Sequence, residues 1–178
     1  MPLPGTNVRI ADETNAPLPA GEIGGIQVKG DNVFSGYWRM PEKTREEFTD
    51  DGYFKTGDVG KTDEQGYVSI VGRSKDLVIS GGYNVYPKEI EELIDAMPGV
   101  VESAVIGVPH PDFGEAVTAV VVKKKDANEL TDVAIIQALK KEIANYKVPK
   151  KVFFVDDLPR NAMGKVQKNV LRETYNTR

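Results

Sequence analysis

The residue of this sequence best suited to chemistry is a lysine that directly follows a glycine. The segment PRNAMGKVQK runs from Pro159 to Lys168, and Lys165 comes after Gly164. Proline restricts the entry to a loop and glycine loosens its exit, so the segment predicts an exposed loop with Lys165 at its tip. A lysine there is a movable point charge that can meet an anion and then release it. The alternative is an ordinary solvated surface lysine.

A second candidate is the carboxylate that ends the segment YFKTGD, Asp58. Thr56 and Gly57 allow a tight bend, and a carboxylate can accept hydrogen bonds from both hydroxyls of a ribose. Arg73 follows the next predicted strand, Tyr67 to Val71, and would converge with Asp58 on one nucleotide if the two strands pair. The alternatives are an aspartate that only caps a turn and a surface ion pair of little energetic value.

The glycine pair Gly81-Gly82 follows a predicted strand, Leu77 to Ile79, and precedes a predicted helix that begins at Pro87. Glycines allow a ligand or another backbone to come close, so a phosphate cradle is one interpretation. Neither the dinucleotide nor the Walker spacing is present, and a simple hairpin turn is the other interpretation.

Aromatic and basic side chains occur together in two further loops. Phe113 could stack on an adenine or cover the edge of a sheet. Tyr146 precedes Lys147 and Lys150, a combination that fits a phosphate-bearing ligand and equally an amphipathic surface.

The composition excludes several kinds of site. The 178 residues contain no cysteine and one histidine, His110, so a disulfide framework, a thiol nucleophile and a multi-histidine metal site are excluded. A catalytic triad would have one possible base, and no nucleophile is marked beside it. We therefore predict a structural role for His110 and no metal site in this chain.

The charge is distributed unevenly. Residues 1–119 carry 10 Lys/Arg and 20 Asp/Glu, whereas residues 120–178 carry 13 Lys/Arg and 7 Asp/Glu. A basic C-terminal third in an acidic protein indicates an anionic partner such as a nucleotide, a polyphosphate or a nucleic acid. No apolar run reaches membrane-spanning length, and the first ten residues lack the apolar centre of a signal peptide. A cytoplasmic protein without a membrane partner is expected.

The element pattern predicts an α+β protein with two parts. Up to about residue 72, short alternating strands are separated by polar turns, which predicts a small antiparallel barrel or sheet with one short helix from Pro41 to Phe48. The following residues read strand, helix, strand, strand, helix, strand, which is the split βαββαβ pattern with two helices on one face. In these helices Ile90 and Ile94, and Ile135 and Leu139, recur at the spacing of one buried face, the last strand is expected at Val152 to Val155, and a closing helix is expected at Asn169 to Tyr175. The boundary falls in the charged segment 72–76, and we expect domains at 1–75 and 76–178.

Three segments, taken in this order, resemble the C-terminal motifs of the adenylate-forming enzymes (the ANL superfamily). They are YFKTGD, GRSKDLVISGGYNVYPKEIE and PRNAMGK. The superfamily includes acyl-CoA synthetases, adenylation domains of peptide synthetases and firefly luciferase. The resemblance covers nearly the whole chain. Across GYWRMPEKT, MPGVVESAVIGVPHPDFGEAVTAVVV and VFFVDDLPRNAMGKVQKNVLRE it is greatest to malonyl-CoA synthetases.

The resemblance implies a reaction and roles within it. Such enzymes join a carboxylate to ATP, giving an acyl-adenylate and pyrophosphate, and then pass the acyl group to the thiol of CoA. By motif, Asp58 would hold the ribose of ATP or AMP with Arg73 beside it. Lys165 would be the catalytic lysine of the first half-reaction, because a cation there offsets charge that develops on the phosphate. Lys75 matches the hinge position.

The resemblance also implies a CoA site. Gly81 and Gly82 would line the channel for the pantetheine arm, where any side chain would narrow it. The CoA nucleotide would lie near an aromatic and basic group of residues, namely Phe113, Tyr146, Lys147 and Lys150. Malonate is the expected acid. Mg²⁺ is expected in the full enzyme, with no ligand for it among the residues identified here.

The family also needs an upstream loop, rich in Ser, Thr and Gly, that holds the phosphates and is not found in this sequence. We therefore expect residues 1–75 to be the β-rich end of a large N-terminal AMP-binding domain, and residues 76–178 to be the mobile C-terminal domain. The missing N-terminal domain would be the partner, and the fragment alone is expected to be inactive.

Two alternatives to the CoA ligase remain. One is the matching portion of a peptide-synthetase adenylation domain, whose acceptor is a carrier protein; the other is a free-standing nucleotide- or CoA-binding module without catalysis. A protein acyltransferase is a further expected partner, because acylation of the exposed Lys165 would remove its charge. No nucleic acid partner is expected under any of these hypotheses.

Overall fold

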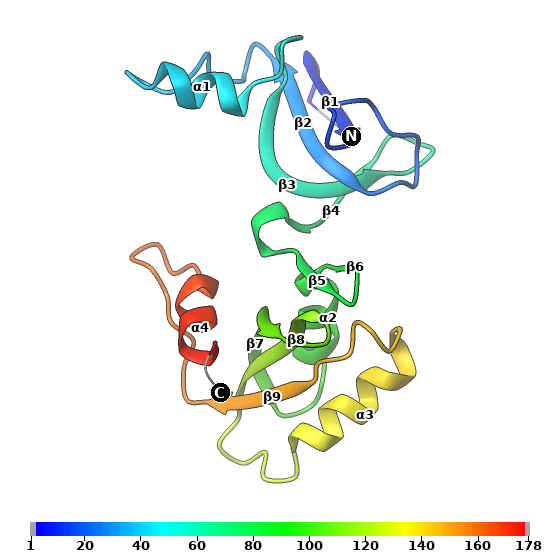
Figure 1. Ribbon diagram of the computed structural model, residues 1–178, viewed down its shortest axis with the longest axis vertical. Helices are drawn as coiled ribbons and strands as arrows, with labels where there is room; N and C mark the ends of the chain where they lie inside the picture. Colours follow the sequence, from blue (N-terminus) through cyan, green and yellow to red (C-terminus); the bar gives the residue numbers. More distant parts are fainter. Residues whose placement is uncertain (1–2, 177–178) are drawn as a thin grey trace. The chain divides into compact units, whose positions relative to one another are not determined.

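The computed structural model describes residues 3–176, and the chain divides between Lys75 and Asp76 into two compact units. The first unit is built from strands with one short helix, and the second mixes strands and helices (Figure 1). Each unit has its own sheet and core, so the two are described separately below.

The first unit is a meander of antiparallel strands. Its strands are β1 (Thr6–Ala11), β2 (Gly24–Gly30), β3 (Phe54–Thr62) and β4 (Val68–Arg73), paired in the order β1-β2-β3-β4. Buried Ile10, Ile26 and Val59 form its small core. Of the two predicted alternatives, the sheet is correct and the closed barrel is wrong, because β1 and β4 remain the outer strands among the described residues.

A long connection between β2 and β3 carries the short helix α1 (Pro41–Glu47), which begins at a proline as predicted. Phe34 packs edge-on against Phe48 and Phe54, which are tilted against each other, with ring centroids 5.0–5.6 Å apart. The turn before β3 is held by Asp51, which pairs with Arg9 at 2.6 Å. Hydrogen bonds from Arg9 and from the Thr49 hydroxyl lower the pKa of Asp51 to about 2.

The second unit follows the predicted strand and helix order with one addition. Its elements, listed in chain order, are β5 (Val78–Ser80), β6 (Tyr83–Val85), α2 (Pro87–Asp95), β7 (Val100–His110), β8 (Gly114–Lys123), α3 (Asp132–Glu142), β9 (Lys151–Val155) and α4 (Lys168–Tyr175). The split βαββαβ class is confirmed, and the additional element is β6, which forms a hairpin with β5. The predicted fold class, α+β, is therefore correct.

The sheet of this unit is built along β8. One side of β8 pairs with β7 over its whole length, and the other side pairs with β9 in parallel from Thr118 to Val122. β5 touches β8 only through Ser80 and Gly114. Because β5 has three residues and β8 has ten, most of that side of β8 is left for β9.

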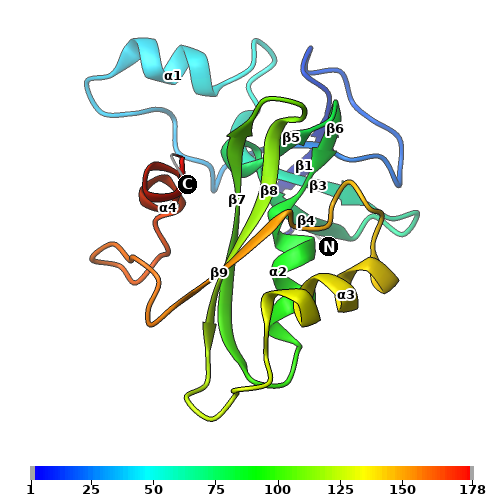
Figure 2. The ribbon, with the colours of Figure 1, turned by 60° about the horizontal axis from the view of Figure 1, so that its bottom comes forward.

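Helices cover both faces of this sheet (Figure 2). α2 and α3 bury Ile90, Ile94, Ile135 and Leu139 against one face, as their helical spacing predicted. The other face is covered by α4 through Leu171 and Tyr175. α3 begins at Thr131, whose hydroxyl accepts a hydrogen bond from the Ala134 amide at 3.2 Å. In residues 3–176, no helix is long and apolar enough to cross a membrane.

Candidate functional site

The loop that carries Lys165 connects β9 to α4 and is shaped by its own hydrogen bonds (orange in Figure 1). The Asn161 side-chain oxygen accepts from the amides of Met163 at 3.0 Å and Lys165 at 2.9 Å. The Asn161 amide donates to the Lys165 carbonyl at 2.9 Å, and the Gly164 amide donates to the Asn161 carbonyl at 2.9 Å. Gly164 has a φ of +77°, a conformation that suits glycine. The loop is therefore exposed but internally ordered.

Two ion pairs attach this loop to the rest of the unit. Arg160, at its start, pairs with Glu102 of β7 and also donates to the Gly164 carbonyl at 2.6 Å. Lys168, at its end, pairs with Glu91 of α2 at 2.6 Å. Both ends of the loop are thus tied to elements of the sheet and its covering helix.

The Lys165 ammonium differs from the basic groups around it. Arg160 and Lys168 on the same loop are paired with carboxylates, and so is Arg172 of α4, which contacts Asp76 at 3.0 Å. Lys165 is exposed, and no described residue pairs with its side chain. Its charge is therefore available to an anion that comes from outside the unit, as the sequence predicted for the tip of a loop.

The predicted ribose-binding pair is formed in the first unit. β3 and β4 pair so that Asp58 and Arg73 face each other, and the Arg73 Nε lies 2.8 Å from the Asp58 Oδ1. The Thr56 hydroxyl accepts from the Asp58 amide at 3.1 Å, and Gly57 has a φ of +73°. The guanidinium holds one carboxylate oxygen and leaves the other free to accept hydrogen bonds from a ligand.

Lys75 is the middle residue of a 3₁₀ turn, Ser74–Asp76. Its two neighbours make side-chain contacts in different units. The Ser74 hydroxyl donates to the Gly57 carbonyl at 3.1 Å in the first unit. Asp76 pairs with Arg172 in the second unit. Lys75 is exposed, with no described partner for its side chain, so rotation of its backbone would break none of these contacts within either unit.

Gly81 and Gly82 form the two-residue turn between β5 and β6, and their φ values are +59° and +83°. Two successive positive φ values are typical of a type I′ hairpin, which explains the two glycines without a ligand. A Cβ at Gly82 would meet no atom within 4 Å, and one at Gly81 would lie 3.8 Å from the Phe113 ring. The turn therefore has open space on its outer side.

The predicted aromatic and basic residues lie around this turn. Phe113 is next to it, because its carbonyl accepts from the Gly81 amide at 2.9 Å, and the Lys150 Nζ lies 5.4 Å from the Phe113 ring centroid. Tyr146 stacks on Tyr83, which directly follows the glycines, with ring centroids 4.6 Å apart.

Lys147 differs from Lys150 in this group. Its Nζ contacts both carboxylate oxygens of Glu89 at 2.8 Å, so its charge is already balanced. Lys150 donates only one long hydrogen bond, 3.4 Å, to the Asn145 carbonyl. Lys150 is therefore the better placed of the two to meet a phosphate.

The Lys165 loop and the glycine turn lie at different ends of β7. The loop is tied to Glu102 near the start of β7, whereas the turn adjoins the connection after His110 at its end. Eight residues of strand separate these points, a distance of about 26 Å at about 3.3 Å per residue. One unit therefore carries two groups of candidate residues, which are attached at different places along β7.

Several residues that build these groups were missed from the sequence. Asn161 shapes the lysine loop, and a side-chain oxygen that caps nearby amides is a known property of asparagine in turns, so this role could have been inferred. Tyr83 and the carboxylates Glu91 and Glu102 had no such local signal, because their partners are far away in the sequence.

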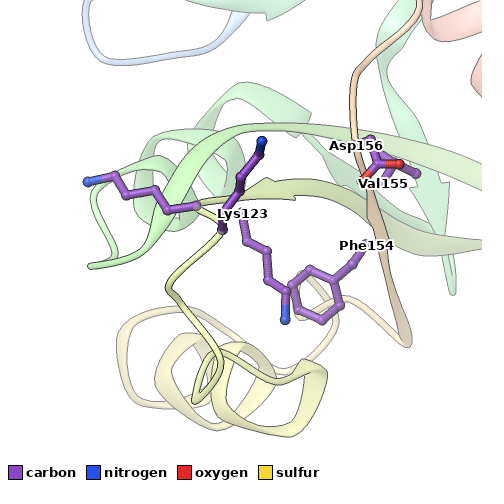
Figure 3. Close-up of a pocket in the computed structure, with 6 residues that line it drawn as sticks. Lys123, Phe154, Val155 and Asp156 are labelled. Atoms are coloured by element: carbon purple, nitrogen blue, oxygen red, sulfur yellow. The ribbon is translucent and has the colours of Figure 1, made fainter.

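A shallow pocket of about 250 Å³ lies elsewhere on the second unit, lined by Lys123 to Lys125 and by Phe154, Val155 and Asp156 (Figure 3). Lys123 lies over the ring of Phe154, 4.8 Å from its centroid, as Figure 3 shows. Lys123 is thus occupied by a cation–π contact, and Asp156 adds a negative charge to the rim. This pocket has no geometric link to the candidate residues described above.

Part of the second unit matches a known protein family. Residues 89–165 match the family model of the AMP-binding enzyme C-terminal domain. Residues 89–165 thus belong to the family of AMP-binding enzyme C-terminal domains. The resemblance to the adenylate-forming enzymes is thereby confirmed, and the match ends at Lys165 itself.

Several relatives of this chain are CoA ligases. FadD13, a long-chain-fatty-acid–CoA ligase of Mycobacterium tuberculosis, is 45% identical over 170 residues, 96% of this chain and 33% of the relative. The ATP-bound structure of MatB from Rhodopseudomonas palustris is 67% identical with a TM-score of 0.93 and covers 98% of this chain and 35% of that one. The apo structure of MatB is 68% identical over 98% of this chain and 34% of that one, with a TM-score of 0.71. The chain thus spans about a third of the length of these proteins.

Proposed function

We propose that this chain is the C-terminal portion of an AMP-forming acid–CoA ligase and that it supplies the catalytic Lys165 and the hinge at Lys75. The observation that carries this proposal is the ordered loop that presents an unpaired ammonium while its neighbouring cations are paired. Family membership, and relatives that are CoA ligases, support the reaction class.

In the first half-reaction, a carboxylate oxygen attacks the α-phosphorus of ATP, and pyrophosphate leaves. Negative charge increases on the phosphate oxygens in the transition state, and the Lys165 ammonium would offset it without forming a covalent bond. Asp58, oriented by Arg73, would accept hydrogen bonds from the ribose hydroxyls. In the second half-reaction the thiol of CoA attacks the acyl carbon, and AMP leaves.

The second half-reaction would use the other end of the second unit. Gly81 and Gly82 would leave the pantetheine arm room to pass, and Phe113 and Tyr146 would offer ring faces to the adenine of CoA. Lys150 would meet a phosphate, and Lys147, which is paired with Glu89, would hold the segment in place.

Because Arg160 and the glycine turn are attached at points of β7 that lie about 26 Å apart along the strand, we infer that the two groups serve different half-reactions. The proposal therefore includes rotation at Lys75 between the half-reactions. A related observation comes from MatB, whose ATP-bound and apo structures match this chain with different TM-scores, 0.93 and 0.71, over the same coverage. MatB itself therefore takes more than one conformation over this region.

The proposed acid is malonate, on the strength of the motif resemblance and of 67% identity to MatB, a malonyl-CoA synthetase. The proposed partner is an N-terminal AMP-binding domain with a phosphate-binding loop, to which residues 1–75 would belong. Mg²⁺ is proposed as a further cofactor of the full enzyme. In the described part of the chain, no group of three or more acidic or histidine side chains is placed to hold a metal ion.

Two smaller parts of the proposal concern location and regulation. ATP and CoA are cytoplasmic metabolites, so the cytoplasm is the proposed site of action. The exposed ammonium of Lys165 would be accessible to a protein acyltransferase, and acylation there would remove the charge that adenylation needs. The long-chain-fatty-acid–CoA ligases among the matched relatives favour neither the carrier-protein alternative nor the binding-module alternative.

The test is to graft this chain into MatB of R. palustris in place of the matching third of that protein. With malonate, ATP and CoA, the graft should release pyrophosphate and form malonyl-CoA, whereas the 178-residue chain by itself should do neither. A second series with acetate and a long-chain fatty acid measures whether the graft keeps the acid preference of MatB. A folded graft that hydrolyses no ATP with any acid would overturn the proposal, and adenylation without transfer to CoA would favour a carrier protein as acceptor.

A further inference from the structure

Glu91 is the only charged residue that is buried in the described part of the chain, with 9% of its surface exposed. A buried carboxylate is costly unless it is paired and hydrogen-bonded. Glu91 has two partners: its Oε1 accepts from the Val105 amide at 2.8 Å and lies 2.6 Å from the Lys168 Nζ. A buried charge with two such partners fixes the elements that supply them.

The first partner belongs to a strand edge. Among the described strands β7 pairs only with β8, so amides such as that of Val105, on its other side, need an acceptor from elsewhere. Glu91 of α2 supplies that acceptor. The carboxylate of Glu91 is thereby fixed relative to the sheet. A cation that pairs with this carboxylate is therefore also held in a fixed position.

The second partner begins the helix that follows the catalytic loop. Lys168 is the first residue of α4 and comes three positions after Lys165. A lysine at a helix N-terminus opposes the helix dipole, so this position is locally unfavourable. The pair with Glu91, in which Lys168 is only 17% exposed, offsets that penalty. A locally unfavourable residue that is held by a long-range contact fits a positioning role.

The loop between these anchors is itself ordered. Arg160 ties its start to Glu102, Asn161 caps two of its amides, and the Gln167 amide donates to the Pro159 carbonyl at 2.7 Å. These hydrogen bonds fix the shape of the loop internally, so the direction in which Lys165 projects depends on its two attachments. Of the two, the Glu91–Lys168 pair is the more buried.

We propose that Glu91 and Lys168 are positioning residues for Lys165: the buried ion pair between α2 and α4 holds the loop so that the ammonium reaches the α-phosphate. The inference rests on the proposed function of Lys165. It adds that α2, which lies on the face of the sheet opposite α4, controls adenylation through residues that do not contact the substrate.

The test compares Glu91→Gln with Glu92→Gln in the MatB graft. Glutamine at 91 still accepts from the Val105 amide but loses the charge that holds Lys168. Glu92 is the matched control, since it is exposed on the same helix and pairs only with Lys88 at 3.6 Å. Glu91→Gln should lower pyrophosphate release about tenfold to a hundredfold, the range expected when a catalytic group is misplaced. Thioester formation from supplied malonyl-adenylate should change little.

Three outcomes separate the possibilities. An equal loss in both half-reactions would mean that Glu91 only stabilises the unit, and unchanged adenylation in a folded Glu91→Gln variant would also overturn the inference. If Lys165→Ala itself leaves adenylation intact, the proposed function fails rather than the positioning role alone. Should Glu91→Gln not fold, Lys168→Gln and Lys168→Arg test the same contact from the helix end, and only the arginine variant should retain adenylation.

The 178-residue chain offers a second readout that needs no substrate. In Glu91→Gln, the backbone amides of residues 161–166 should change in ¹⁵N relaxation and chemical shift, whereas those of α3 should not. In Glu92→Gln neither set should change. Loop amides that are identical in Glu91→Gln and the unmodified chain would contradict the proposal.

Discussion

The two ends of β7 differ in how they hold their positive charges. At the Lys165 end, Arg160 and Lys168 are paired with carboxylates while the cation between them is left without a described partner. At the glycine-turn end, Lys147 is paired and Lys150 lies beside an aromatic ring, with stacked rings nearby. The first arrangement suits a charge that acts on a transition state, and the second suits a surface that binds a nucleotide.

This difference predicts that the two ends fail in different half-reactions. Substitutions at the lysine end should affect adenylation through kcat, because charge is stabilised there only in the transition state. Substitutions at the turn end should affect thioester formation and the KM for CoA. If both ends affected both steps equally, the contrast would reflect stability alone.

The largest effect is expected from Lys165→Ala in the MatB graft. Removal of one group that stabilises transition-state charge lowers rates by about 10² to 10³. Pyrophosphate release should fall by that factor, while thioester formation from supplied malonyl-adenylate should continue. Lys125→Ala, on an exposed loop lysine outside both groups, is the control and should change neither rate. If Lys165→Ala lowered pyrophosphate release and thioester formation by the same factor, the two ends of β7 would not serve different half-reactions.

The local structure around Lys165 was predictable, but the contacts that hold it were not. Proline and glycine at fixed positions indicated an exposed loop, and the spacing of Ile90 and Ile94 indicated the buried face of α2. Both signals depend on neighbours in the sequence. Glu91 and Lys168 are 77 positions apart, and no local pattern distinguishes Glu91 from the exposed Glu92 beside it.

The same limit applies to strands. β6 was missed because it has three residues, two of them polar or aromatic, and forms only through its hairpin with β5. β9 was recognised from its apolar residues, but its parallel pairing with β8 follows from the shortness of β5, which a strand pattern does not indicate. The Asp58–Arg73 pair could be anticipated, since strand register alone brings its members together.

A smaller effect is expected at the other end from Gly81→Asn. Asparagine followed by glycine is the preferred type I′ turn, so this variant should fold with a free energy of unfolding within about 0.5 kcal/mol of the unmodified chain. Gly81→Ala should instead lose about 1–2 kcal/mol, because alanine is strained at positive φ. Urea denaturation of the 178-residue chain measures both.

The asparagine variant therefore separates the two reasons for a glycine at this position. If the turn lines the pantetheine path, the added side chain should lower thioester formation in the graft by about tenfold and leave pyrophosphate release unchanged. Thioester formation at the unmodified rate would mean that the glycines serve the hairpin and nothing more.

The smallest effect is expected from Lys150→Gln compared with Lys147→Gln. A solvent-exposed lysine near a phosphate contributes at most about 1 kcal/mol, so Lys150→Gln should raise the KM for CoA about two- to fivefold without changing the KM for ATP. The increase should shrink at high salt, because exposed charges are screened. Lys147→Gln should leave the KM for CoA nearly unchanged and lower stability instead, since it releases Glu89 from its 2.8 Å contact. If Lys147→Gln instead raised the KM for CoA more than Lys150→Gln, the Lys147–Glu89 ion pair would have to open when CoA binds. The glycine-turn end would then, like the lysine end, present an unpaired ammonium to its ligand, and the contrast between the two ends would be lost.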